Sequence, residues 1–391
     1  MNTSSPATTS ADAAMVAPSV VPVQSRSEFF SSDQAAMFPE VTGRETQWKL
    51  SPVAKLRPLI DGTLDGYCYP IEFTQSTGFS VDWNATALVK RGAAGLPEDR
   101  LTANAWGQSE EVLLVTIEGE HPEPLRIVRD NLGETAKSGH TIVSVKPGAK
   151  ASLVMVSKGL ATLAETVEFE LGEGSSLQAV FVGQWDSGTI QYASHFATIG
   201  KGASLTHIVV DVGGDIVILN PSVHLVGERS EAHLFGGYFA DATQHQEHRV
   251  YVDHVGEQTV SRVNYKGALH GKGARTVWVG DVLIGPDAIG TDSYEQNRNL
   301  VLSEGTRADS IPNLEIKTGD IKGAGHASAT GRFDDEQLFY LQSRGIEELD
   351  ARRLVVLGFL LEIIQKIDDT ELAGELTVIF QEKLTKTEKA L

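Results

Sequence analysis

The stretch IPNLEIKTGDIKGAGHASATGRFDDEQLFYLQSRGI, residues 311–346, changes character along its length and so shows how the chain is divided. At its start, Leu314 and Ile316 alternate with polar neighbours, which is the two-residue period of a half-buried strand. Its middle, 323–331, consists mostly of small residues and has one side chain able to bind a metal, His326. Its end has the composition of a helix. The stretch therefore predicts a β region, a lone accessible histidine, and a helical region.

Upstream of this stretch, between Glu111 and Gly331, short runs rich in β-branched and aromatic residues alternate with glycine-containing turns. One turn recurs, because the sequences around Gly148, Gly174 and Gly202 resemble one another at intervals of 26 and 28 residues. Weaker copies of this turn follow at 228–232, 257–259 and 304–306. Strands at a fixed period predict a β-helix, in which each coil buries its apolar edge on the next. A sandwich or barrel would not need such a period.

Composition and periodicity divide the chain into four parts. We predict a disordered tail at 1–42, a mixed and partly helical cap at 43–110, a β-helix core at 111–331, and a helical domain at 332–391. Helices are expected up to Ser343, over 347–367 and over 370–386. The helix over 347–367 is apolar almost all the way round, so it must be covered on more than one side.

The composition also limits the function. The 391 residues include 52 acidic and 33 basic side chains, and this net charge of −19 argues against nucleic-acid binding. No apolar run approaches the roughly 20 residues that span a bilayer, so we expect a cytoplasmic protein. Cys68 is the only cysteine, and its tyrosine neighbours predict a buried or half-buried, unreactive thiol. One thiolate cannot hold an iron–sulfur cluster, which commonly takes four.

No motif predicts catalysis. The chain has no phosphate-binding Gly-Lys-Ser/Thr loop, which indicates that it has no ATP site, and no Gly-x-Ser-x-Gly elbow. His245 and His248 suggest a metal pair, but residues three apart in a strand point to opposite faces. We interpret this pair as solvated β-helix surface. A stand-alone β-helix enzyme stays open as an alternative, although no cluster of acidic residues supports it.

Several short motifs together resemble the SufB/SufD family, whose members are subunits of the SUF machinery for iron–sulfur cluster assembly. They are PNLEI at 312–316, DIK at 320–322, HASATG at 326–331, DDEQLFYLQSRGI at 334–346, Asp253-His254, Tyr265-Lys266-Gly267, Asp281 and QNRNL at 296–300. The near-absence of cysteine fits SufD-like members better than SufB-like ones. Where the family often has Cys-x-His, this chain has Gly323 or Ala324 in the cysteine's place.

The resemblance implies a right-handed parallel β-helix and a non-catalytic role in a SufBCD complex. It implies that the β-helix pairs with SufB and that the C-terminal helices dock the ATPase SufC. It also implies that His326 is a ligand of a transient cluster shared with SufB, none being held stably by this chain alone. The candidate SufC-docking residues are Phe339, Tyr340, Arg344, Leu354, Leu357, Phe359 and Leu360. A SufD-like homodimer acting only as a structural scaffold remains the alternative.

Overall fold

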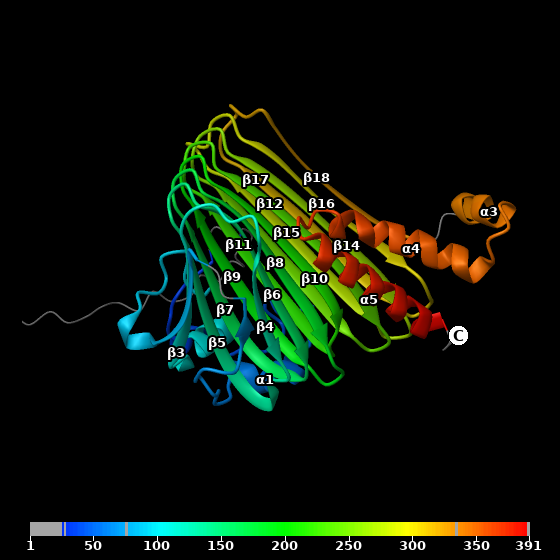
Figure 1. Cartoon of the computed structure of the whole chain (residues 1–391), viewed down its shortest axis with the longest axis horizontal. Helices are drawn as coiled ribbons and strands as arrows, with labels where there is room; N and C mark the ends of the chain where they lie inside the picture. Colours follow the sequence, from blue (N-terminus) through cyan, green and yellow to red (C-terminus); the bar gives the residue numbers. More distant parts are fainter. Residues whose placement is uncertain (1–25, 27–28, 75–76, 333–334, 389–391) are drawn as a thin grey trace, which may run out of the picture.

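A computed structural model describes residues 26, 29–74, 77–332 and 335–388. The chain winds alternately through two nine-stranded sheets and forms a β-solenoid of about eight turns (Figure 1). Each solenoid strand pairs in parallel with the strands one coil before and after it, because each coil repeats the direction of the last, and the strands of the first and last coils have one such partner. The predicted mainly β fold, a parallel β-helix followed by C-terminal helices, is confirmed.

The two sheets face each other across the apolar interior. Sheet A contains β3 (Glu111–Ile117), β5 (Gly133–Val145), β7 (Ala161–Leu171), β9 (Ile190–Ile199), β11 (Ile216–Leu225), β13 (His245–His254), β15 (Arg275–Ile284) and β17 (Arg307–Ile316). Sheet B contains β4 (Leu125–Asp130), β6 (Lys150–Gly159), β8 (Ser176–Trp185), β10 (Ser204–Gly213), β12 (Glu231–Asp241), β14 (Val260–His270), β16 (Asp292–Val301) and β18 (Gly323–Gly331). Valine, leucine and isoleucine from both sheets fill the space between them.

The recurring turn forms one corner of the solenoid. At this corner Gly148, Gly174, Gly202, Arg229 and Gln258 all have positive φ, between 55° and 71°. The backbone N–H of each donates to a carbonyl of the next coil's corner, at 2.7–2.9 Å. The predicted repeat is therefore the stacking of successive corners. One predicted copy was misplaced: Gly305 joins β16 to β17, so it lies at the opposite corner.

The region 43–110 covers the outer face of sheet A and also extends both sheets. Helices α1 (Val53–Ile60) and α2 (Arg100–Gln108) pack with sheet A in a separate apolar cluster. Strands β1 (Glu72–Phe73) and β2 (Phe79–Ala85), which the sequence did not indicate, pair antiparallel with β4 and β3.

Most of the tail predicted at 1–42 lies outside the described residues. Its described part contacts the body: Phe38 and Val41 are buried, and the Arg26 guanidinium lies 2.9 Å from the Glu98 carboxylate. The residues from 29 to 42 therefore pack on the fold, because two apolar side chains anchor them.

The C-terminal helices are α3 (Asp335–Ser343), α4 (Glu348–Ile364) and α5 (Thr370–Glu388). Helices α4 and α5 lie across the outer face of sheet B, whereas α3 stands away from the solenoid beyond α4 (Figure 1). Leu360, Ile363 and Phe380 are buried against valines of sheet B. Helix α4 thus contacts sheet B, α5 and α3, which is the cover on several sides that its apolar sequence predicted.

Candidate functional site

His326 occupies the last position of a column of side chains that point into the solenoid. His207, Leu234, Val263, Glu295 and His326 are consecutive partners across β10, β12, β14, β16 and β18. Leu234 and Val263 belong to the interior core, so this column faces inward. Among the described strands none pairs with the outer edge of β18. The imidazole is therefore 43% exposed, at the open end of an otherwise closed interior.

Glu295 lies directly behind this imidazole. Its Oε1 is 3.9 Å from His326 Nδ1, its side chain is 1% exposed, and neither carboxyl oxygen has a hydrogen-bond partner among the described residues. Burial, together with the nearby Asp281 carboxylate, raises the pKa of Glu295 to about 8. The carboxyl fits because it lies against Gly280, where a Cβ would come within 2.3 Å of Glu295 Oε2.

The approach to His326 is a shallow pocket at the edge of β17. Leu314 and Glu315 of β17, Asp281 of β15 and Arg26 line it together with the imidazole. Within the described part of the chain, no three histidine, cysteine, aspartate or glutamate side chains come together as a metal site. His326 and Glu295 therefore offer an incomplete set of metal ligands.

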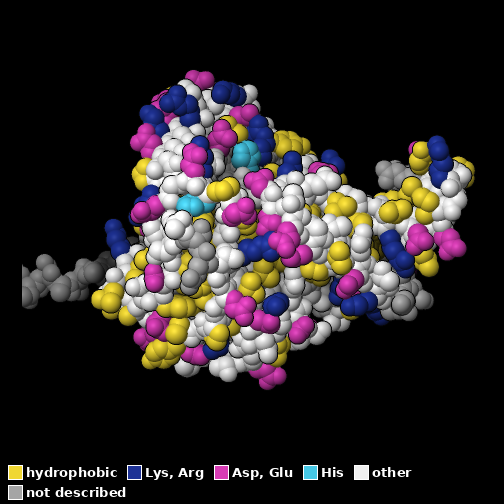
Figure 2. All heavy atoms as spheres, viewed as in Figure 1, with side chains coloured by type: hydrophobic (Ala, Val, Ile, Leu, Met, Phe, Trp, Pro, Cys, Tyr) yellow, Lys and Arg dark blue, Asp and Glu magenta, His cyan; other side chains and the backbone are white. Residues whose placement is uncertain are grey.

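The predicted docking residues divide into an exposed group and a buried group. Phe339 and Tyr340 of α3 are 72% and 57% exposed, Leu354 of α4 is 49% exposed, and the Arg344 guanidinium lies over the Tyr340 ring. Hydrophobic side chains are visible on the surface of this protruding lobe (Figure 2).

The other docking candidates lie further inside. Leu357 and Leu360 are buried in the core between the helices and sheet B, and Phe359 is half-buried beneath the Lys266 ammonium. Because sheet B and α5 already cover them, Leu357 and Leu360 offer no surface to a partner on this chain as it is folded.

The interpretation of His245 and His248 as solvated surface was wrong. They do point to opposite faces, but both are buried, and each contacts a carboxylate at 2.9 Å. His245 pairs with Glu247 under the N-terminal cap, while His248 pairs with Asp211 inside the solenoid. The sequence could not supply Asp211 as the partner of His248, since it lies more than one coil away, whereas Glu247 is only two residues from His245.

Cys68 also differs from its prediction, because it is exposed rather than buried. Its backbone N–H donates to the Glu111 carboxylate at 2.8 Å. A hydrogen bond from the thiol to the same carboxylate raises the pKa of Cys68, which disfavours the reactive thiolate.

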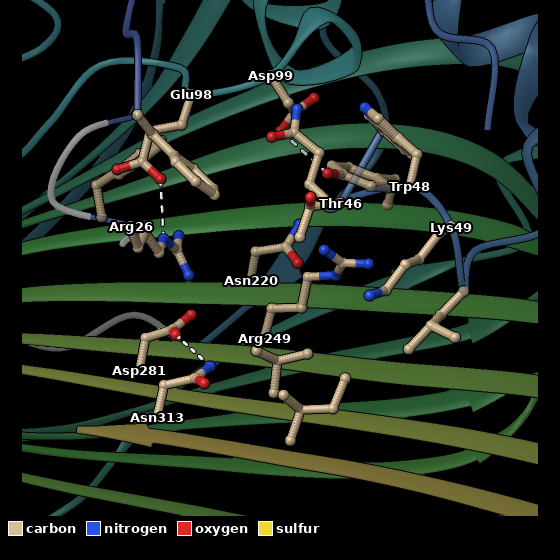
Figure 3. Close-up of a pocket in the computed structure, with 17 residues that line it drawn as sticks. Arg26, Thr46, Trp48, Lys49, Glu98, Asp99, Asn220, Arg249, Asp281 and Asn313 are labelled. Carbon is tan, nitrogen blue, oxygen red and sulfur yellow. Dashed lines mark hydrogen bonds and ion pairs between the residues drawn. The ribbon is translucent and has the colours of Figure 1, made fainter. Parts of the chain in front are cut away.

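A second pocket lies on the outer face of sheet A beneath the N-terminal segment (Figure 3). Asn220 points into it, is buried, and has no hydrogen-bond partner among the described residues for either amide atom. Its charged lining residues are the cations Arg26, Lys49 and Arg249 and the carboxylates Glu98, Asp99 and Asp281. Because these charges balance, the pocket presents no net charge that would select a ligand.

Comparison with known proteins shows which family has this architecture. Residues 127–359 match the SufBD core domain of the SUF system for iron–sulfur cluster assembly. The chain belongs to the SufB/SufD family. It is 43% identical over 373 residues to a SufBD-family iron–sulfur cluster assembly protein of Mycobacterium tuberculosis, covering 93% of this chain and 94% of that one. It is 31% identical over 173 residues to the cluster assembly protein SufD of Escherichia coli, covering 44% and 40%.

The SufB/SufD motifs in the sequence led to His326 but not to Glu295. The two residues are one coil apart, so the repeat could in principle have paired them. The clear copies of the turn gave 26 to 28 residues per coil, whereas Glu295 precedes His326 by 31. A spacing of 28 residues would have been wrong by three. Because strand side chains alternate between the two faces, this odd error would also have placed Glu295 on the opposite face.

Among the described residues, no helix is long and apolar enough to cross a bilayer.

Proposed function

We propose that this SufB/SufD-family chain is a non-catalytic, cytoplasmic subunit of a SufBCD-type scaffold for iron–sulfur cluster assembly. The observation that carries the proposal is the open end of the solenoid, where two strand edges have no partner among the described strands and lie beside a half-exposed imidazole. The cluster is cargo, held transiently between this chain and a SufB-like partner. A SufC-like ATPase binds the C-terminal helical lobe.

The edges of β17 and β18 support pairing with the SufB-like subunit. Each is the last strand of its sheet, and an uncovered edge is a template for a further strand. Ile316 of β17 and Tyr294 of β16 are exposed nearby, at 45% and 42%. A partner that extends both sheets would cover these side chains and bring its own ligands beside His326.

The cysteine count supports a shared cluster. Clusters are commonly held by four thiolates, and the single thiol here, Cys68, lies in the N-terminal region rather than beside His326. The remaining ligands must then come from another chain. This requirement agrees with the lack of a complete metal site among the described residues.

The lobe formed by α3 and the start of α4 supports docking of the ATPase. Phe339, Tyr340 and Leu354 are exposed large side chains, and an aromatic and arginine cluster of this kind is typical of interface hot spots. Because α4 also packs on sheet B, a force applied to this lobe reaches the solenoid through the α4 core. ATP turnover in SufC would thereby change the SufB-facing end.

Co-expression with a SufB-like and a SufC-like subunit tests both surfaces. Ile316→Lys should release the SufB-like subunit and keep the ATPase, because it places a charge at the sheet edge. The matched control is Val255→Lys, since Val255 is also 45% exposed but lies away from β17 and β18. Phe339→Ala with Tyr340→Ala should release only the ATPase, whereas Val378→Ala on α5 should not.

Size-exclusion chromatography with subunit quantification reads the result. An intact three-subunit complex in both test variants would refute the assigned surfaces. A chain that forms only a stable homodimer, sensitive to Ile316→Lys, would favour the structural-scaffold alternative instead.

A further inference from the structure

The inward-facing column of sheet B changes its chemistry in its last two coils. Leu234 and Val263 are buried apolar residues, and Glu295 and His326 follow them at the next two positions. A carboxyl and an imidazole therefore replace aliphatic side chains where the solenoid opens. His207, further along the same column, is also polar, but it has a hydrogen-bond partner in His195, whereas Glu295 has none among the described residues.

The Glu295 carboxyl is buried at this position without a hydrogen bond from any residue that the structure describes. Its two carboxyl oxygens have no hydrogen-bond partner among the described residues, although the side chain is 99% removed from solvent. A buried polar group without a partner destabilises a fold. Gly280 leaves the space that the carboxyl occupies. The site is thus shaped for a carboxyl that the fold itself does not use.

We propose that Glu295 and His326 act together as a two-donor binding site for a divalent first-row metal ion, with ferrous iron as the cargo. This inference rests on the proposed function and adds a second donor from the same chain. Carboxylate oxygen and imidazole nitrogen are both suitable ligands for such ions.

The geometry is close to what one ion requires. Ligand atoms at about 2.1 Å from an ion lie roughly 3.0–3.4 Å apart for angles between 90° and 109°. His326 Nδ1 and Glu295 Oε1 are 3.9 Å apart. A movement of the half-exposed imidazole by less than about 1 Å would close that difference, while the buried carboxyl stays in place against Gly280.

Two donors leave the ion incompletely coordinated. Because the described residues contain no third ligand at this position, water or a partner subunit must supply the rest. The chain alone should bind such an ion weakly and release it readily. A partner that contributes thiolates at the open edge would complete the site, which is how a transiently held cargo would be transferred or built upon.

Cobalt(II) alone, added to the full-length chain with ring-labelled histidine, provides the test. His326 should show a hyperfine-shifted imidazole resonance in the wild type, and the Ala variant of His326 identifies that signal by its loss. Glu295→Gln keeps the side-chain volume but removes the carboxylate, and should weaken the apparent affinity at His326 by at least tenfold. Glu315→Gln removes a nearby charge that lines the same pocket, and should leave the affinity unchanged.

The outcomes separate this inference from the proposed function. Wild-type affinity at His326 in Glu295→Gln would overturn the role of Glu295 and leave His326 as a ligand. Wild-type protein without any shifted His326 resonance at millimolar cobalt, alone and with its SufB-like partner, would overturn the pair and weaken the proposed ligand role as well. The melting temperature of Glu295→Leu checks folding: it should equal or exceed that of the wild type, since the column then continues as apolar residues.

Discussion

His195 Nδ1 lies 2.8 Å from His207 Nε2 inside the solenoid, with both rings against Phe181. One imidazole donates and the other accepts, so the hydrogen bond requires at least one neutral ring. Burial lowers the pKa of His195 to about 3 and lowers the pKa of His207 well below its usual value. The pair is therefore neutral in the folded protein at physiological pH.

This pair predicts acid sensitivity. Both folded-state pKa values lie below the unfolded value near 6.5, so the unfolded chain binds more protons in acid. Above about pH 6.5 the pair does not reduce the free energy of unfolding. This free energy falls as the pH drops from about 6.5 toward the folded-state pKa values. Each histidine should cost about 2 kcal/mol of unfolding free energy between pH 7 and pH 5.

Urea denaturation at the two pH values measures this loss. Replacing both His195 and His207 by leucine should reduce the acid-induced loss by about 4 kcal/mol. His121→Leu, which removes a half-buried histidine outside this pair, is the control variant. An unaltered slope in the double variant would show that this pair does not control acid stability.

The ion pair between Arg129 and Glu165 predicts a large effect on stability. Two guanidinium nitrogens of Arg129 contact the two Glu165 oxygens at 2.6 and 2.7 Å, and both side chains are 3% exposed. Glu165→Gln leaves a buried guanidinium without its counter-charge and should cost about 3–5 kcal/mol. The double change Arg129→Met with Glu165→Leu should recover most of that loss. Chemical denaturation of a full double-mutant cycle tests this, and additive effects would rule out coupling.

Backbone conformation predicts opposite effects for two glycine substitutions, one at a corner of the solenoid and one in helix α4. Gly174 has a φ of +66° with open space around an added Cβ, so Gly174→Ala should cost about 1–2 kcal/mol from backbone strain alone. Gly358 lies within α4, also with open space, so Gly358→Ala should stabilise by about 0.5–1 kcal/mol. Thermal melting of the two variants compares them. Equal shifts in the same direction would contradict the conformational argument.

The helical layer predicts partial unfolding without loss of the solenoid. Phe380 of α5 is fully buried in the cluster between the helices and sheet B, which is separate from the solenoid interior. Phe380→Ala should cost about 3–5 kcal/mol and expose α4 and α5 to limited proteolysis. Val378→Ala on the exposed face should change stability by less than about 0.5 kcal/mol. Proteolytic resistance equal to that of the wild type would refute the prediction.

Local patterns made the β-helix and its helical end predictable. The corner requires positive φ, which glycine adopts freely, so Gly148, Gly174 and Gly202 recorded the period in the sequence. The helix over 347–367 is apolar almost all the way round, which predicted that other elements cover it, and sheet B and α5 do so. Both features depend on residues that interact with neighbours one coil or one layer away.

The site was only partly predictable, because it depends on register. The coil lengthens late in the solenoid, where Val260 pairs with Asp292 and Asp292 with Gly323, so the early period could not align Glu295 with His326. The pairing of His248 with Asp211 and the exposure of Cys68 likewise depend on long-range packing. The burial of Phe38 and Val41 was hidden by the polar composition around them.

Purification of the tagged chain from its native cells, with quantification of the subunits that accompany it, tests the central claim most directly. The account predicts a SufC-like ATPase and a cysteine-bearing SufB-like subunit in fixed proportion. It predicts selective loss of the ATPase from the Phe339→Ala, Tyr340→Ala variant and of the sister subunit from Ile316→Lys. Recovery of the chain without either subunit would contradict the account.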